Sequence, residues 1–210
     1  MRSANFATLV RVLMMLGVIY LIMIKFNPIS IIIIIAIMML LDAVDGYLAV
    51  SDVSGGSVSL GAYTRAVMGN ANAASYVKRY RQRLSKSSPL GARIDVAGDR
   101  VIELLFWITF TYLHLIPLFI LIIVIIRHSF VDALMAGKGT SSKMKTKFAR
   151  IVYSSSIGRG GINVVKFLTF SYLVLVYVSG YPIVIGYILV TILVAYILLR
   201  GLAEIYEVIA

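Results

Sequence analysis

The sequence predicts an all-α integral membrane protein with six transmembrane helices and with both termini in the cytoplasm. Of its 210 residues, 60% are apolar, which is outside the range of soluble domains. The apolar residues form runs close to the roughly 20 residues that cross a bilayer, and the basic residues gather in alternate connections. The absence of cysteine excludes disulfide and thiolate chemistry, and two histidines argue against a histidine-rich zinc site. One membrane domain, 1–210, is the simplest organisation.

Six apolar runs define the expected spans. The first, 6–24, is interpreted as a retained helix because no small-residue cleavage site follows it, and Arg11 near its start is placed to snorkel towards the headgroups. Pro28 suits the start of the second helix. A short tail follows the last span and carries Glu204 and Glu207. The remaining spans are expected at 29–50, 91–115, 117 to beyond 126, 162–178 and 183–199.

The segment 51–88 differs from the spans and is interpreted as an insertion. It opens with a polar stretch, 51–57, that predicts a flexible turn, and it is then expected to be helical from about 60 to 84. It is too polar to span a bilayer, so we expect it in the cytoplasm or on the membrane surface. Its basic residues cluster late, at Lys78, Arg79, Arg81, Arg83 and Lys86.

The distribution of basic residues predicts the orientation. With a cytoplasmic N-terminus the outer loops are 25–28, 114–117 and 179–182, and only Lys25 of the 20 basic residues lies outside. The inverse orientation would violate the positive-inside rule. The net charge of +11 therefore points to cytoplasmic loops and anionic lipid headgroups rather than to nucleic acid.

Four aspartates stand at the cytoplasmic ends of the second and third spans. Asp42 and Asp45 are three residues apart, and Asp95 and Asp99 are four apart, so each pair lies on one face of a helix. The chain has only nine acidic residues, and ionisable groups at membrane depth mark functional sites. Adjacent helices can bring the two pairs together into one site.

Four carboxylates in a low-dielectric site need either protons or cations. Hard oxygen ligands without histidine or cysteine favour Mg²⁺, Mn²⁺ or Ca²⁺, and four carboxylates can hold two such ions. Glycines at 46, 91 and 98 allow a bulky group to approach the backbone. The alternative is that the aspartates cap helices or pair with Arg93 and Arg100; two pairs with glycines at matching offsets favour the metal interpretation.

These residues resemble the signature of the CDP-alcohol phosphotransferase family, D-x2-D-G-x2-A-R-x8-G-x3-D-x3-D, which lies on the second and third of six transmembrane helices. Two differences stand out: Val50 occupies the arginine position, and the spacing to Gly91 is about 32 residues longer than the signature, counted along the sequence. The insertion therefore falls inside the motif. The matching residues are Asp42, Asp45, Gly46, Ala49, Gly91, Asp95 and Asp99.

The resemblance implies an enzyme of phospholipid synthesis. Two divalent ions, Mg²⁺ or Mn²⁺, would bind Asp42, Asp45, Asp95 and Asp99. Asp99 would deprotonate an acceptor alcohol, whose oxygen attacks the β-phosphorus of a CDP-linked lipid (CDP-diacylglycerol or an archaeal ether analogue), and CMP would leave. The positions of Gly46, Ala49 and Gly91 would line the CDP pocket. The resemblance also suggests a homodimer, and we expect the plasma membrane of a prokaryote, with the site facing the cytoplasm.

The missing motif arginine leads to a hypothesis about the insertion. Seven residues separate Arg83 from Gly91 and nine separate Arg81 from it, where the signature has eight. The end of the inserted helix would return to the site, and Arg83 or Arg81 would bind the CDP phosphate. The alternative is that the cluster at 78–86 only binds lipid headgroups.

A second basic cluster bears on the acceptor. The run at 143–146 resembles the G-K-x-K-T run that follows the fourth span in family members using glycerol phosphate, with Ser142 in place of glycine. Such cations suit a phosphorylated polyol, such as glycerol 3-phosphate or inositol phosphate. Ordinary positive-inside charge is the alternative for any one of them, although Lys166, deep in an apolar run, is harder to explain that way. The candidate ligands are Lys143, Lys145, Arg150 and Arg159.

Other functions remain open from the sequence. The same chemistry could use serine or another unphosphorylated alcohol. A divalent-cation transporter would also need membrane carboxylates, but these cluster at one face, and the outer halves of the spans offer almost no polar ladder. A catalytically inactive relative that only binds CDP-lipids is the third alternative, raised by Val50 and the insertion.

Overall fold

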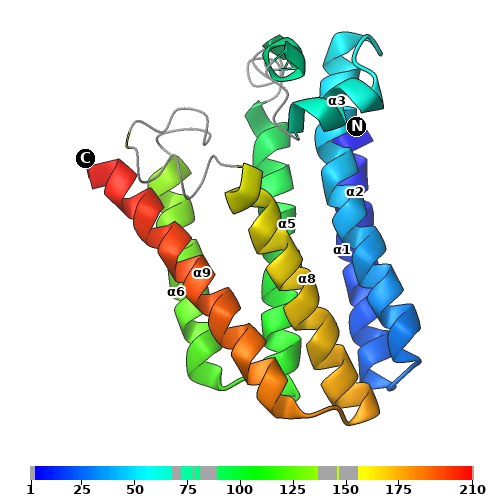
Figure 1. The fold of residues 1–210 in the computed structure, drawn as a ribbon, viewed down its shortest axis with the longest axis vertical. Helices are drawn as coiled ribbons and strands as arrows, with labels where there is room; N and C mark the ends of the chain where they lie inside the picture. The colour runs from blue at the N-terminus through cyan, green and yellow to red at the C-terminus, as the bar shows by residue number, and fades with distance from the viewer. Residues whose placement is uncertain are drawn as a thin grey trace. The chain divides into compact units, whose positions relative to one another are not determined.

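The computed structural model describes residues 3–67, 72–77, 79–80, 89–136, 146 and 156–209. Nearly all of these residues are helical, and none of them forms a strand (Figure 1). The helices are α1 (Ser3–Met23), α2 (Pro28–Ser54), α3 (Leu60–Val67), α5 (Pro89–Tyr112), α6 (Leu118–Ala136), α8 (Ser156–Ser179) and α9 (Ile183–Ile209).

Each of the six expected spans coincides with a helix. Within the described ranges, four helices contain stretches long and apolar enough to cross a membrane, and these are Phe6–Met23, Pro28–Ser54, Gly161–Ser179 and Ile183–Ile209. The other two expected spans form α5, of 24 residues, and α6, of 19. The first half of α5 is strongly charged, because it carries both aspartates of the second motif half. Large apolar side chains such as Leu40, Leu118 and Ile188 remain more than half exposed, as expected for surfaces that face lipid.

The chain divides into two compact units. Unit 1 comprises Met1–Tyr20 and Ile33–Glu103, and unit 2 comprises Leu21–Ile32 and Leu104–Ala210. Unit 1 therefore contains most of α1 and α2, all of α3 and the charged first half of α5. Unit 2 contains the apolar second half of α5 together with α6, α8 and α9.

The core of unit 2 is aromatic where α5 meets α8. Phe106 and Phe170 stack with their ring centroids 4.6 Å apart, and Trp107 meets Phe170 edge-on at 5.7 Å. Phe110 completes the group at 6.0 Å from Phe170. Trp107 and Phe110 are fully buried. Trp107 is thus a packing residue of this core. α9 packs against both α6 and α8.

The ends of α2 are set by local side-chain chemistry. At its start Asn27 Oδ1 accepts hydrogen bonds from the backbone N–H groups of Ile29 (2.9 Å) and Ser30 (3.2 Å), which is an N-cap. At its end Gly55 and Gly56 adopt positive φ angles of 60° and 80°, which a helix C-terminus favours. The expected turn at 51–57 was therefore placed too early, because α2 continues to Ser54. Helix at 60–67 and 72–77 agrees with the helical insertion that the sequence predicted.

The expected tail after residue 199 is also a correction, since α9 continues without a break to Ile209. Glu204 and Glu207 are buried, at 3% and 5% exposure. Two carboxylates within a short C-terminal stretch predict a polar segment exposed to solvent. The helix period nevertheless places both on the same face as Gly201, which is also buried.

Candidate active site

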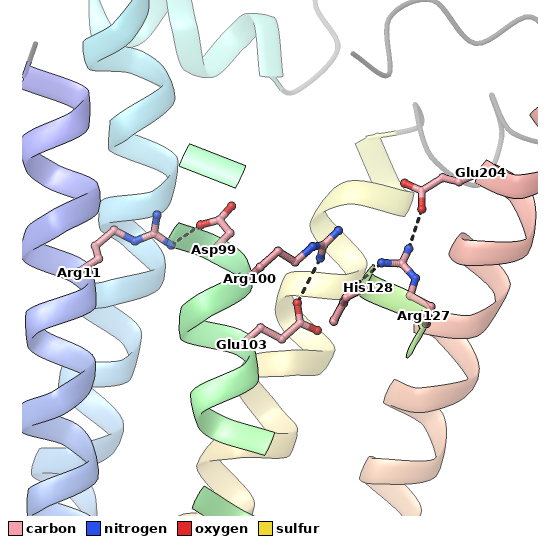
Figure 2. Close-up of polar contacts among 7 residues, drawn as sticks. All are labelled: Arg11, Asp99, Arg100, Glu103, Arg127, His128 and Glu204. Carbon is pink, nitrogen blue, oxygen red and sulfur yellow. Dashed lines mark hydrogen bonds and ion pairs between the residues drawn. The ribbon is translucent and has the colours of Figure 1, made fainter. Parts of the chain in front are cut away.

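A single arginine joins the two halves of the aspartate motif. Arg11 of α1 lies with its Nη1 atom 2.9 Å from Asp42 Oδ1, and with its Nη2 atom 2.9 Å from Asp99 Oδ1. Asp42 belongs to α2 and Asp99 to α5, and all three residues lie in unit 1. Figure 2 shows the contact between Arg11 and Asp99. The first aspartate of the motif and the last one therefore share one guanidinium group.

The arginine approaches these aspartates from the buried side. The Arg11 side chain is only 6% exposed, whereas the side chains of Asp42 and Asp99 are 30% and 43% exposed. The Oδ1 atom of Asp99, which faces Arg11, is itself buried. The exposed part of Asp99 therefore faces away from Arg11. The expectation that Arg11 snorkels was wrong, because two carboxylates bind its guanidinium inside the unit.

Close packing between α1 and α5 brings these groups together. Thr8 is 4% exposed and lies one turn before Arg11, while Gly98 is buried and directly precedes Asp99. A Cβ atom at position 98 would collide with Cγ2 of Thr8. Gly98 had been expected to admit a bulky substrate group. Within unit 1 the space where a side chain of residue 98 would lie is instead occupied by Thr8 of α1.

Asp45 and Asp95 lie in α2 and α5, one turn from Asp42 and Asp99 respectively, but their side chains are outside the described part of the structure. Among the described side chains there is no group of three or more metal-ligating residues. Asp42 and Asp99 fit a divalent cation by their chemistry, since each offers a carboxylate that is partly open to solvent. Oxygen donors of this kind suit Mg²⁺ or Mn²⁺.

The arginine position of the family signature is enclosed by the inserted segment. Val50 is 1% exposed and packs in a cluster with Val58, Tyr63 and Val77. A guanidinium at this position would be buried among apolar groups, which is costly without a partner. Val58, Tyr63 and Val77, which follow α2 in the sequence, therefore supply the apolar surroundings of the position where the signature has arginine.

The same segment also covers the neighbouring glycine. A Cβ atom at Gly46 would collide with the hydroxyl of Tyr63, and the Tyr63 ring meets Tyr47 edge-on with centroids 5.8 Å apart. Ala49 is half-buried. Any CDP pocket along this stretch of α2 would have Tyr63 of α3 as a wall.

Several sequence candidates fall outside the described residues. Gly91 and Arg159 lie within α5 and α8, but their surroundings are not described, and Lys166 is a half-buried residue of α8. The candidates wholly outside the described ranges are Arg81, Arg83, Lys143, Lys145 and Arg150.

Glu103, one turn after Asp99 on α5, pairs with an arginine of the same helix. Its Oε2 atom lies 3.4 Å from Arg100 Nη1, three residues earlier on α5 (Figure 2). Glu103 is 4% exposed and Arg100 is partly exposed. This pair keeps a buried carboxylate neutralised within α5.

Unit 2 contains a buried polar network that the sequence did not reveal. Arg127 of α6 places Nη2 2.7 Å from Glu204 Oε2 of α9, and its Nη1 lies 2.9 Å from His128 Nδ1 (Figure 2). Arg127, His128 and Glu204 are all at most 9% exposed. Gly201 makes room for the arginine, since a Cβ there would lie 2.9 Å from Arg127 Nε. His128 and Asp132 are four residues apart on α6, a spacing that could hold a metal, but His128 faces Arg127.

The end of α9 also binds the second basic segment. Glu207 Oε2 accepts hydrogen bonds from the Thr146 backbone N–H (2.9 Å) and from its hydroxyl (2.7 Å). Thr146 is the threonine of the run that resembles G-K-x-K-T, and Lys145 directly precedes it. The helix thus fixes one residue of this segment by a carboxylate that is itself 5% exposed.

One signal in the sequence could have identified both arginines. Arg11 and Arg127 each interrupt an otherwise apolar run, and a charge inside such a run marks an internal partner. Their partners could not be read from spacing, because they lie on other helices. Comparison with protein-family models, with curated proteins and with solved structures finds no match to the chain.

Proposed function

We propose that the protein is an integral-membrane CDP-alcohol phosphotransferase. It would transfer the substituted phosphate of a CDP-linked lipid to an alcohol and release CMP. One observation supports this most strongly: one guanidinium group, that of Arg11, contacts both Asp42 and Asp99. These two aspartates come from the two halves of the split motif, which the insertion separates in the sequence. A pair of unrelated capping aspartates would not need to meet.

The role proposed for Asp99 follows from its exposure. Its carboxylate is partly open, so an acceptor hydroxyl can approach and give up its proton to the outer oxygen. The acceptor oxygen then forms a bond to the β-phosphorus, and the bond from that phosphorus to the CMP oxygen breaks. A bound divalent cation would neutralise the pyrophosphate charge. Asp42, Asp45, Asp95 and Asp99 are the residues that would hold it.

The acceptor is proposed to be a phosphorylated polyol, such as glycerol 3-phosphate or inositol phosphate. Support comes from the basic segment at 143–150 and from the anchoring of its Thr146 by Glu207. The six-span topology, the cytoplasmic termini and the position of the site at the cytoplasmic face of a prokaryotic plasma membrane are part of the same proposal. They rest on the distribution of basic residues.

The proposal is tested by CMP release from purified protein in detergent. CDP-diacylglycerol and its archaeal ether analogue are offered with glycerol 3-phosphate, inositol phosphate or serine, with Mg²⁺, Mn²⁺ or a chelator. We expect metal-dependent CMP release with one phosphorylated acceptor and its loss in Asp99→Asn. Asp52→Asn is the matched control, because Asp52 is an exposed aspartate near the end of α2. Divalent-cation flux into liposomes without CMP release from any pair would contradict the proposal.

A further inference from the structure

We infer that Arg11 is a positioning residue for the divalent-cation site. It binds two of the carboxylate ligands of that site, Asp42 and Asp99, from the buried interior of unit 1. The inference rests on the proposed function, since it concerns the same aspartates. It adds a residue of α1 that lies outside the signature of the family the sequence resembles. By its position in the sequence alone, near the start of an apolar run, Arg11 would be expected to reach the lipid headgroups.

Burial determines on which side of the carboxylates Arg11 lies. Arg11 is 5% exposed, and the Asp99 oxygen that it contacts is buried. The side chains of Asp42 and Asp99 are nevertheless 30% and 43% exposed. The accessible surface of Asp99 is therefore on the side away from Arg11, and Asp42 also keeps part of its side chain open to solvent, so a cation can reach both carboxylates.

Geometry explains why an arginine is suited to this position. The two contacts come from different terminal nitrogens of one planar group, each 2.9 Å from its carboxylate oxygen. A guanidinium has a fixed fork of donors, so it sets the separation of Asp42 and Asp99 as well as neutralising part of their charge. Lysine offers a single nitrogen and cannot reproduce this arrangement. Partners that orient metal ligands in this way typically contribute about ten- to hundredfold to metal affinity.

The Thr8–Gly98 contact keeps the arginine in place. Thr8 fills the space over Gly98 one turn from Arg11, so α1 and α5 pack closely at this level. Arg11 therefore reaches the aspartates from a helix that is in close contact with α5. Such packing suits a positioning residue.

The test is Mn²⁺ binding to the purified protein in detergent. Binding is measured by calorimetry and by the loss of the electron paramagnetic resonance signal of free Mn²⁺. We expect Arg11→Met to weaken Mn²⁺ binding about tenfold or more. Arg11→Lys, which retains the charge, should lose less. Arg100→Met is the matched control, because it removes a positive charge from a residue that pairs with Glu103 instead; its affinity should stay within about twofold of the original.

Coupling separates positioning from a general structural role. In an Asp99→Asn background, Arg11→Met should weaken Mn²⁺ binding much less than it does alone, because one of the ligands that it positions is already lost. Equal losses in the two backgrounds would overturn the inference. Unchanged binding in Arg11→Met would do so too, and tighter binding would show instead that the guanidinium competes with the cation.

The variants also separate this inference from the proposed function. If the original protein binds no Mn²⁺ and Asp42→Asn changes nothing, the proposed function fails. If the original protein binds Mn²⁺, and Asp42→Asn abolishes binding while Arg11→Met does not weaken it, only the inference fails. If Arg11→Met does not fold, the comparison rests on Arg11→Lys, for which affinity equal to the original overturns the inference.

Discussion

Gly98 of α5 lies so close to Thr8 of α1 that a single methyl group at position 98 would collide with the Thr8 side chain. We expect Gly98→Ala to destabilise the protein by about 1–3 kcal/mol through overpacking. It should also reduce CMP release, because Asp99 and Arg11 depend on the same contact. Thermal unfolding in detergent measures the first effect and the CMP assay the second.

A compensating substitution provides the control for this prediction. Thr8→Ser removes the methyl carbon that a Cβ at position 98 would meet and keeps the hydroxyl. The double variant Gly98→Ala with Thr8→Ser should therefore recover most of the stability and activity. Additive losses in the double variant would show that Gly98 is needed for another reason, such as the approach of substrate to the backbone.

Placing the arginine of the resembled signature at position 50 should destabilise this chain. Val50 is 1% exposed in an apolar cluster with Val58, Tyr63 and Val77, so Val50→Arg would bury a charge among apolar side chains. We expect a clear loss of melting temperature and no gain in affinity for CMP. Val50→Ile, which adds one methylene group and no charge, is the control and should cost about 1–3 kcal/mol through overpacking alone, less than Val50→Arg. Tighter CMP binding in Val50→Arg would mean that the signature arginine can function here after all.

The Arg127–Glu204 pair should stabilise unit 2 through its burial. Both side chains are at most 8% exposed, so Glu204→Gln leaves a buried guanidinium without its carboxylate. Breaking a buried pair typically costs about 3–5 kcal/mol, which corresponds to a melting temperature lower by about 6–20 °C for a chain of this size.

Replacing both partners tests whether the loss comes from an uncompensated charge. Arg127→Met with Glu204→Gln removes both charges, and the melting temperature should lie above that of either single variant. His128 contacts Arg127 as well, so we expect incomplete recovery. A double variant less stable than both single variants would show that the network contributes through packing rather than charge.

The contact between Thr146 and Glu207 should affect acceptor use. Thr146→Val removes the hydroxyl that donates to Glu207 Oε2 at 2.7 Å while keeping the side-chain shape. On the proposed function we expect the KM for the phosphorylated acceptor to rise about threefold to tenfold, in line with one lost hydrogen bond. The KM for the CDP-lipid should not change. Steady-state CMP release at varied acceptor and varied lipid gives both values.

Thr191→Val is the matched control for this experiment. Thr191 lies on α9 and its hydroxyl bonds to the carbonyl of Tyr187 within the same helix at 2.8 Å. Its substitution should leave both KM values within about twofold. Equal increases in the two KM values of Thr146→Val would assign the contact to overall stability rather than to the acceptor.

The helices were predictable because each span is defined by a local pattern. Apolar runs, Pro28 after Asn27, and glycines at a helix end carry their information within a few neighbouring residues. The prediction failed at two helix ends. α2 continued into a polar stretch, and α9 continued past two glutamates whose polarity suggested a tail. At the end of α9, contacts distant in sequence hold the two glutamates, since Glu204 pairs with Arg127 and Glu207 accepts hydrogen bonds from Thr146. At the end of α2 the contacts are local, since the Ser54 hydroxyl donates to the carbonyl of Ser51.

The aspartates were identified from the sequence, but their surroundings were not. Charge, spacing and glycine placement single out Asp42 and Asp99 because acidic residues are rare and costly in such runs. No local pattern connects them to Arg11, which precedes them by 31 and 88 residues, or connects Val50 to a cluster built by the insertion. Each of these contacts depends on which helices pack together.

Composition and hydrophobic period indicated a helical protein with stretches long and apolar enough to cross a membrane, and they singled out two pairs of aspartates within two of its helices. These properties act over one helix at a time. The packing between helices is what brings Arg11 to Asp42 and Asp99, places Thr8 in the space left by Gly98, and covers Val50. Those outcomes depend on steric fit and ion pairing between helices, whose partners no sequence spacing specifies.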